Sequence, residues 1–171
     1  SKAKTIKKYL GRGYQVIASN GHIKDLPKSK LGIDVKGNFN IDLVPINGKG
    51  DKILRIQELA KDAQNIFLAP DPYREGEAIA FHIQEEIGKK KNIFRITFNA
   101  VTKTEVQKAM ENPTELNQNM YDSQRTRRVL DRLVGYKISP ILWDKIQRGI
   151  SAGRVQSVAL RIIVEREDEI K

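Results

Sequence analysis

Apolar residues recur at two different spacings over residues 1–116, and these spacings predict helices that alternate with strands. Apolar positions three and four apart predict helices at residues 1–10, 49–64, 75–87 and 102–110. Short apolar runs rich in β-branched residues predict strands at residues 14–19, 41–46, 65–69 and 93–98. The order strand, helix, strand, helix is typical of an α/β layer with right-handed crossovers.

Individual residues refine several of these elements. Thr102 and Glu105 have the spacing of a capping box, which predicts that a helix begins beside Thr102. Pro45 has no backbone N–H, so we expect the strand over residues 41–46 to lie at a sheet edge. Residues 20–39 are rich in Gly, Pro, Lys and Asn and are predicted to form a loop.

The pattern changes after residue 116, where the predicted strands stop. Helical spacing of apolar residues then predicts three helices, at residues 121–136, 138–147 and 153–171. This change indicates a domain boundary near residues 116–119. We therefore predict an α/β domain over residues 1–116 and an all-α segment over residues 117–171.

The charge is basic and unevenly distributed along the 171 residues. The formal net charge is +10, with +7 on residues 1–50, −2 on residues 51–122 and +5 on residues 123–171. An acidic middle between basic flanks suits a polyanionic ligand and a metal centre, although a basic surface that serves only solubility gives the same charge. The absence of cysteine excludes disulfides and thiolate metal sites, and no apolar run predicts a membrane span or a secretory signal.

An acidic cluster, DPYREGEAIAFH, lies where a predicted strand meets a predicted helix. Asp71 follows the strand over residues 65–69, and Glu75 begins the next helix. Ligands of open α/β sheets bind beyond the carboxyl ends of the strands, where both carboxylates would reach one Mg²⁺. Arg74 lies between them and is suited to contact a phosphate. The alternative is a solvated helix start whose acids suit the helix dipole.

Arginines gather on the predicted helices that follow the boundary. Arg125, Arg128 and Arg132 share one helix face, because they are three and seven residues apart. Exposed ion pairs contribute under about 1 kcal/mol, so phosphate binding explains this density better than stability does. Further polar side chains that we expect to reach nucleic acid follow Gly153 and are Arg154, Gln156 and Ser157. The alternative there is a helix start capped by Ser151.

Three long stretches resemble the type IA DNA topoisomerases, the family of bacterial topoisomerase I: REGEAIAFHI, RRVLDRLVGYKISPILWDKI and RGISAGRVQSVALRIIVERE. The resemblance covers the whole chain. It implies that residues 1–116 form a Toprim domain, a Rossmann-like fold with a mainly parallel sheet and flanking helices, here without its first strand. Residues 117–171 would begin the helical DNA-binding domain. The family cleaves one DNA strand through a tyrosine, passes another strand, and reseals the break, with Mg²⁺ and without ATP.

The resemblance also implies roles for individual residues. Lys2 would contact the scissile phosphate, and His22 resembles a Gly-His pair near the site. We assign Lys2, His22 and Arg74 to catalysis and Asp71 and Glu75 to Mg²⁺. The residues implied in the DNA groove are Arg127, Arg128, Asp131 and Arg132. The implied partners are single-stranded and negatively supercoiled DNA, and we expect a monomer in the cytoplasm, near the nucleoid.

Three departures from the family change this expectation. The family motif is Asp-x-Asp-x-Glu, but Tyr73 stands at its middle position, so we expect weak metal binding with Glu77 as an outer-shell carboxylate. The catalytic glutamate of the family would precede Ser1, and its nucleophilic tyrosine would follow residue 171. We therefore expect the isolated chain to be inactive. The alternatives are another Toprim enzyme, such as a primase or nuclease, or a non-catalytic nucleic-acid-binding fragment.

Overall fold

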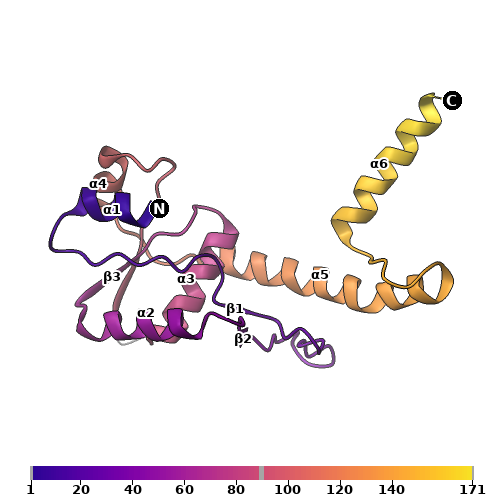
Figure 1. The fold of residues 1–171 in the computed structure, drawn as a ribbon, viewed down its shortest axis with the longest axis horizontal. Helices are drawn as coiled ribbons and strands as arrows, with labels where there is room; N and C mark the ends of the chain where they lie inside the picture. The colour runs from indigo at the N-terminus through magenta and orange to yellow at the C-terminus, as the bar shows by residue number, and fades with distance from the viewer. Residues whose placement is uncertain (1, 89–90, 171) are drawn as a thin grey trace. The chain divides into compact units, whose positions relative to one another are not determined.

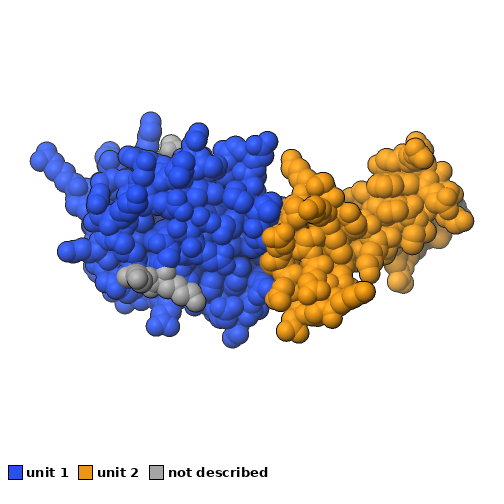
Figure 2. Space-filling view, turned by 90° about the horizontal axis from the view of Figure 1, so that it is seen from below, with its two compact units in different colours: residues 1–25, 43–125 blue, residues 26–42, 126–171 orange. Residues whose placement is uncertain are grey.

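The computed structural model describes residues 2–88 and 91–170, which divide into two compact units (Figure 2). The first unit comprises residues 1–25 and 43–125, and the second comprises residues 26–42 and 126–171. These units are defined by packing and do not coincide with the predicted domains 1–116 and 117–171. That division of the sequence stays a prediction.

The first unit is an α/β layer (Figure 1). Two parallel strands, β3 (Asn65–Leu68) and β4 (Asn92–Arg95), pair from Asn65 opposite Asn92 to Leu68 opposite Arg95. Its complete helices are α1 (Lys2–Leu10), α2 (Gly50–Asp62), α3 (Arg74–Ile87) and α4 (Lys103–Glu111). This order confirms the predicted fold class, in which a helix connects two parallel strands.

The core of this unit lies where the apolar faces of α2 and α3 meet β3. Its buried members come from all three elements and from the segment before β1, and they are Ile23, Ile53, Ile56, Leu68, Ala80 and Ile83. Ile79 and Ile87 extend the ridge on α3 and pack against this cluster. Full burial of each large aliphatic side chain stabilises the fold by about 1.5–3 kcal/mol, so helical spacing decides which faces point inward.

The predicted strand over residues 14–19 is wrong, because the structure has no strand there. A β-strand requires backbone pairing with a neighbour, and within the described residues this apolar segment pairs with none. The prediction over residues 41–46 is correct only in its centre, where β2 (Val44–Pro45) pairs antiparallel with β1 (Lys24–Asp25). We did not predict β1, which lies in the expected loop.

Helix α4 follows the predicted capping box, since the backbone N–H of Glu105 donates to Oγ1 of Thr102 across 3.3 Å. Helix α5 (Gln118–Lys145) corrects another prediction: it is one helix where two were expected, and Pro140 lies inside it. Proline has no backbone N–H, so the carbonyl of Tyr136 loses its helical partner while the helix continues.

The second unit contains most of α5, helix α6 (Arg154–Ile170) and the loop over residues 26–42. The indole N–H of Trp143 donates to the carbonyl of Ile150 across 2.5 Å and ties the connection between the helices to α5. The predicted end of the last helix, Lys171, lies outside the described residues, as does Ser1. Among the helices of residues 2–88 and 91–170, none is both long and apolar enough to cross a membrane.

Candidate active site and nucleic-acid contacts

Asp71 lies just beyond the carboxyl end of β3, where its backbone is held by a buried arginine from the neighbouring strand. Arg95, at the end of β4, is 2% exposed. Its guanidinium donates to the carbonyl of Asp71 across 2.7 Å and to that of Pro70 across 2.9 Å. The same nitrogen that contacts Pro70 lies 3.3 Å from the carbonyl of Leu68. The guanidinium therefore fixes the turn that carries Asp71.

Glu77 is the charge partner of this arginine. Its Oε2 accepts from Nε of Arg95 across 2.9 Å, and its Oε1 accepts from the backbone N–H of Asn117 across 2.7 Å. The carboxylate is buried, and both of its oxygens are engaged. The structure therefore gives Glu77 a structural role as the buried partner of Arg95, and its expected role as an outer-shell carboxylate of the metal site stays a prediction.

Gly76 allows the first turn of α3 to approach the backbone of Asp71. A Cβ atom at this position would lie 1.9 Å from the carbonyl oxygen of Asp71 and 2.8 Å from its carbonyl carbon. No side chain larger than hydrogen fits there without a backbone shift. Glycine therefore sets the separation between Asp71 and the neighbouring Glu75.

Glu75 has two partners within the first unit. Nε2 of Gln124 donates to Oε2 of Glu75 across 3.1 Å, and Nε2 of His22 lies 3.5 Å from the same oxygen. The structure thus brings together His22 and Glu75, which are 53 residues apart in the sequence. We did not predict Gln124, because nothing in its local sequence distinguishes it from an ordinary polar helix residue.

Asp71, Arg74 and Glu75 are all exposed around this turn, so the two carboxylates are open to a solvated ligand. Among the described residues, no cluster of three or more His, Asp or Glu side chains has metal-binding geometry. Mg²⁺ nevertheless commonly binds through one or two carboxylates, with water and substrate phosphate completing its shell. Asp71 and Glu75 suit such a site, and their oxygens match the ligand preference of this cation.

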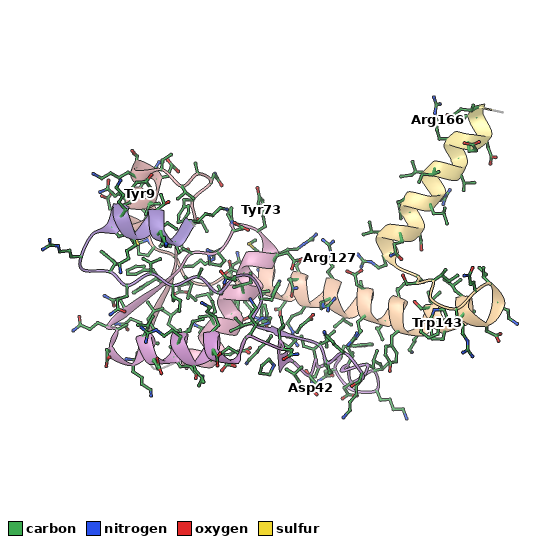
Figure 3. All side chains as sticks on the ribbon, viewed as in Figure 1. Tyr9, Asp42, Tyr73, Arg127, Trp143 and Arg166 are labelled. Carbon is green, nitrogen blue, oxygen red and sulfur yellow. The ribbon has the colours of Figure 1, made fainter. Side chains whose placement is uncertain are left out.

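Tyr73 lies between these carboxylates and is 70% exposed, and its side chain points away from the unit (Figure 3). It occupies the N-cap position of α3 without a side-chain capping bond. A neutral phenol is a poor ligand for Mg²⁺ at neutral pH. The chain therefore offers two carboxylates in this turn and no third one at its centre.

A second imidazole, which we did not predict as a site residue, lies near His22. His82 is 4% exposed, and its ring centroid is 6.0 Å from that of His22. Burial, helped by the nearby His22, lowers the pKa of His82 from 6.5 to about 4. Its Nδ1 has no hydrogen-bond partner among the described residues. His82 is therefore neutral at pH 7. In the sequence it lies on the apolar face of a predicted helix, as any core residue would, so nothing there distinguishes it.

The other predicted catalytic residues lie at helix starts. Lys2 is exposed at the first residue of α1, and Arg74 is exposed at the first residue of α3. In the part of the chain that the structure describes, neither makes a hydrogen bond or ion pair with Asp71 or Glu75. Their roles in phosphate contact stay predictions.

In the second unit, Asp131 lies between two of the predicted DNA-binding arginines. Its Oδ1 is 3.1 Å from Nε of Arg154, and its Oδ2 is 3.7 Å from Nε of Arg127. All three side chains are between 35% and 40% exposed. The carboxylate therefore holds two cations from α5 and α6 near each other while both remain open to solvent.

Arg132 is engaged by the loop of the same unit. Its guanidinium donates to three backbone carbonyls, those of Pro27, Lys30 and Leu31. Its carbon Cζ also lies 5.9 Å from the ring centroid of Tyr136. These contacts give Arg132 a structural role that the helical-face argument did not predict.

The remaining predicted DNA-binding residues have local contacts. Arg125 lies 3.6 Å from Asp122 and 5.7 Å from the ring centroid of Tyr121. Arg128 is half-buried on α5. At the start of α6, Ser157 Oγ donates to the carbonyl of Gly153, and Gln156 Oε1 accepts from Ser151 Oγ. Neither bond caps a backbone N–H of the helix, so the capping alternative and the DNA contact both stay predictions.

Comparison with known proteins identifies the family. Residues 1–101 match the model of the Toprim domain family, and residues 115–171 match the model of a DNA topoisomerase family. The structure is similar to full-length topoisomerase I from Thermotoga maritima, with a TM-score of 0.89 and 44% sequence identity. The alignment covers 99% of this chain and 29% of that chain.

The topoisomerase match over residues 115–171 favours a topoisomerase over the alternative of a Toprim primase or nuclease. The chain spans 29% of the length of the Thermotoga maritima enzyme. By its sequence and its fold, the chain belongs to the bacterial type IA DNA topoisomerases, of which it carries the Toprim domain and part of the adjoining topoisomerase region.

Proposed function

We propose that the chain supplies the Mg²⁺ site and part of the single-strand binding surface of an enzyme that cleaves and reseals one DNA strand. The whole enzyme would relax negative supercoils without ATP. The observation that carries the proposal is the pair of exposed carboxylates, Asp71 and Glu75, on a turn that Arg95 and Gly76 hold rigidly. Such preorganisation is what a site for phosphate chemistry requires.

Each residue of this turn has a distinct part in the proposal. Asp71 and Glu75 would hold Mg²⁺, which when bound offsets the negative charge that develops on a reacting phosphate. Gln124 orients the carboxylate of Glu75 by its 3.1 Å hydrogen bond. Arg74 and Lys2 would bind phosphate oxygens of the same DNA strand as cations. His22 would donate a hydrogen bond beside Glu75.

The second unit would bind the phosphates of single-stranded DNA through the arginines that Asp131 gathers. Arg127 and Arg154 approach this carboxylate from two helices and remain partly exposed. Each cation that neutralises a phosphate releases counterions, so the affinity should fall steeply with salt. We do not assign a nucleophile in this chain, and we expect the isolated chain to leave supercoiled plasmid unrelaxed.

The metal site is tested by titrating the chain with Mg²⁺ in a calorimeter. We expect weak binding that is lost in the double variant Asp71→Ala, Glu75→Ala. Asp51→Ala is the matched control, because Asp51 is also an exposed acid in the first turn of a helix. Equal Mg²⁺ binding by the double variant and the parent chain would contradict the proposed site.

DNA binding is tested by fluorescence anisotropy with a labelled single-stranded oligonucleotide between 50 and 200 mM salt. We expect Arg127→Ala combined with Arg154→Ala to weaken binding and to flatten the salt dependence. Arg161→Ala combined with Arg166→Ala removes two exposed arginines of α6 and is the control. Absence of binding at low salt, or relaxation of plasmid by the isolated chain, would overturn this account.

A further inference from the structure

Residues 32–42 of the second unit form a tight hairpin whose tip is held by its own backbone. Ile33 and Ile41 form an antiparallel bridge, and the N–H of Asp42 donates to the carbonyl of Gly32 across 2.9 Å. Asp34 closes the tip, because its carbonyl accepts from the N–H of Phe39 across 3.1 Å and its Oδ1 accepts from the N–H of Gly37 across 3.0 Å. The hairpin therefore presents a defined surface.

Phe39 lies at this tip in a conformation that aromatic residues rarely adopt. Its φ is +53°, in the left-handed region that Gly and Asn enter at much lower cost. Its side chain is 49% exposed, so core packing does not explain why a large ring occupies this position. Strained backbone of this kind concentrates at functional sites, where the surrounding structure holds it in place.

The base of the hairpin is fastened to the arginine-bearing helix. Arg132 on α5 donates to the carbonyls of Pro27, Lys30 and Leu31, which immediately precede the hairpin. The loop and α5 belong to the same unit, and the loop lies beside this helix in Figure 1. One anchor therefore holds the exposed ring of Phe39 in a fixed place on this unit.

The loop that carries the ring also carries exposed lysines. Lys28, Lys30 and Lys36 are exposed, and within residues 2–88 and 91–170 none of them forms an ion pair. Asp34 and Asp42 offset part of their charge, which leaves residues 26–42 with a formal charge of +1. A loop that combines an exposed aromatic ring with exposed lysines suits a polymer that alternates phosphates with flat bases.

We propose that Phe39 is a stacking platform for a base of single-stranded nucleic acid, with the loop lysines contacting the flanking phosphates. This site rests on the proposed DNA-binding function of the second unit and extends it to a residue outside the arginine helices. Stacking on an aromatic ring tolerates every base, so the site would add affinity without sequence preference.

The experiment uses variants that keep the backbone conformation. Phe39→Gly and Phe39→Asn remove the ring and tolerate the positive φ, so both should fold at least as well as the parent chain. We expect each to bind a labelled single-stranded oligonucleotide at least fivefold more weakly, the lower end of what a base stack contributes. Phe39→Trp should retain binding. Val35→Ala, on the same hairpin, is the control and should bind like the parent chain.

An oligonucleotide that carries abasic sugars separates stacking from phosphate contact. The parent chain and Phe39→Gly should bind it equally, because it offers no base to stack. If Phe39→Gly binds the ordinary oligonucleotide as tightly as the parent chain does, the stacking proposal is wrong while the arginine surface stands. If the parent chain binds no oligonucleotide even at low salt, the proposed DNA-binding function fails first.

Discussion

Nε of Arg95 and Oε2 of Glu77 lie 2.9 Å apart in an ion pair whose two side chains are 2% and 4% exposed. The pair joins Arg95, at the end of β4, to Glu77, near the start of α3, beside the turn that carries Asp71. The guanidinium also holds the carbonyls of Pro70 and Asp71. One buried pair thus supports the fold and positions the candidate metal ligands at the same time.

Removing the arginine should therefore be costly. We expect Arg95→Leu to lower the free energy of unfolding by about 3–5 kcal/mol, because it leaves the Glu77 carboxylate buried without a charge partner. Urea unfolding monitored by circular dichroism measures this loss. Arg55→Ala breaks an exposed pair with Glu58 at 3.0 Å and should cost under about 1 kcal/mol. Equal losses for the two variants would contradict the role of burial.

The contact of Gly76 with the Asp71 backbone makes a second prediction. Gly76→Ala places a methyl group 1.9 Å from the carbonyl oxygen of Asp71, so the backbone must shift. We expect a loss of about 1–3 kcal/mol or more in unfolding free energy, as for overpacked cores, together with weaker Mg²⁺ binding. Gly13→Ala is the control, because nothing lies within 4 Å of a Cβ atom there. If Gly76→Ala is as stable as the parent chain, Gly76 is not packed closely against the backbone of Asp71.

A third carboxylate in the metal turn should strengthen binding. Tyr73→Asp adds an ionised oxygen ligand between Asp71 and Glu75, at a position that is already exposed. We expect at least a tenfold gain in Mg²⁺ affinity by calorimetric titration, since hard cations prefer carboxylate oxygen. Tyr73→Asn is the control for size and for removal of the ring, and it should give a smaller gain. No difference between Asp and Asn would contradict a site at this turn.

His82 should make the stability depend on pH below neutrality. Its pKa is lowered in the fold to about 4 from 6.5, so between these values the unfolded chain binds a proton that the folded chain excludes. The unfolding free energy should thus be highest with respect to this group above pH 6.5, and it should be lower by about 3 kcal/mol at pH 4. Urea unfolding across this range should show a shallower slope for His82→Gln. An NMR titration that places the pKa of His82 near 6.5 would contradict this prediction.

The family and the α/β class could be predicted from the sequence because local patterns of residues indicate both. Helical spacing in α2 and α3 sets which faces are buried, and Thr102 with Glu105 marks the start of α4. The position of Asp71 follows from its place after an apolar strand. These features depend on residues near each other in the chain, so their physical causes are visible without the fold.

Other features depend on neighbours that only tertiary structure provides. Residues 14–19 have the composition of a strand, but among the described residues no strand pairs with them. Helix α5 continues through Pro140, where two helices were expected. The pairing of Glu77 with Arg95 gives an expected metal residue a structural role that its local sequence did not predict. Likewise, Arg132 was expected to bind DNA, and its guanidinium is held by loop carbonyls about 100 residues away in sequence.

The sequence alone thus determined which chemistry the chain carries: carboxylates after a buried strand and arginines on helices. The tertiary structure decided which of those charges are free to perform it. The physical reason is that a charge becomes structural or functional through burial and through the partners that meet it. For Glu77 and Arg95 those partners come from separate elements, and the local pattern of neither residue contains the other.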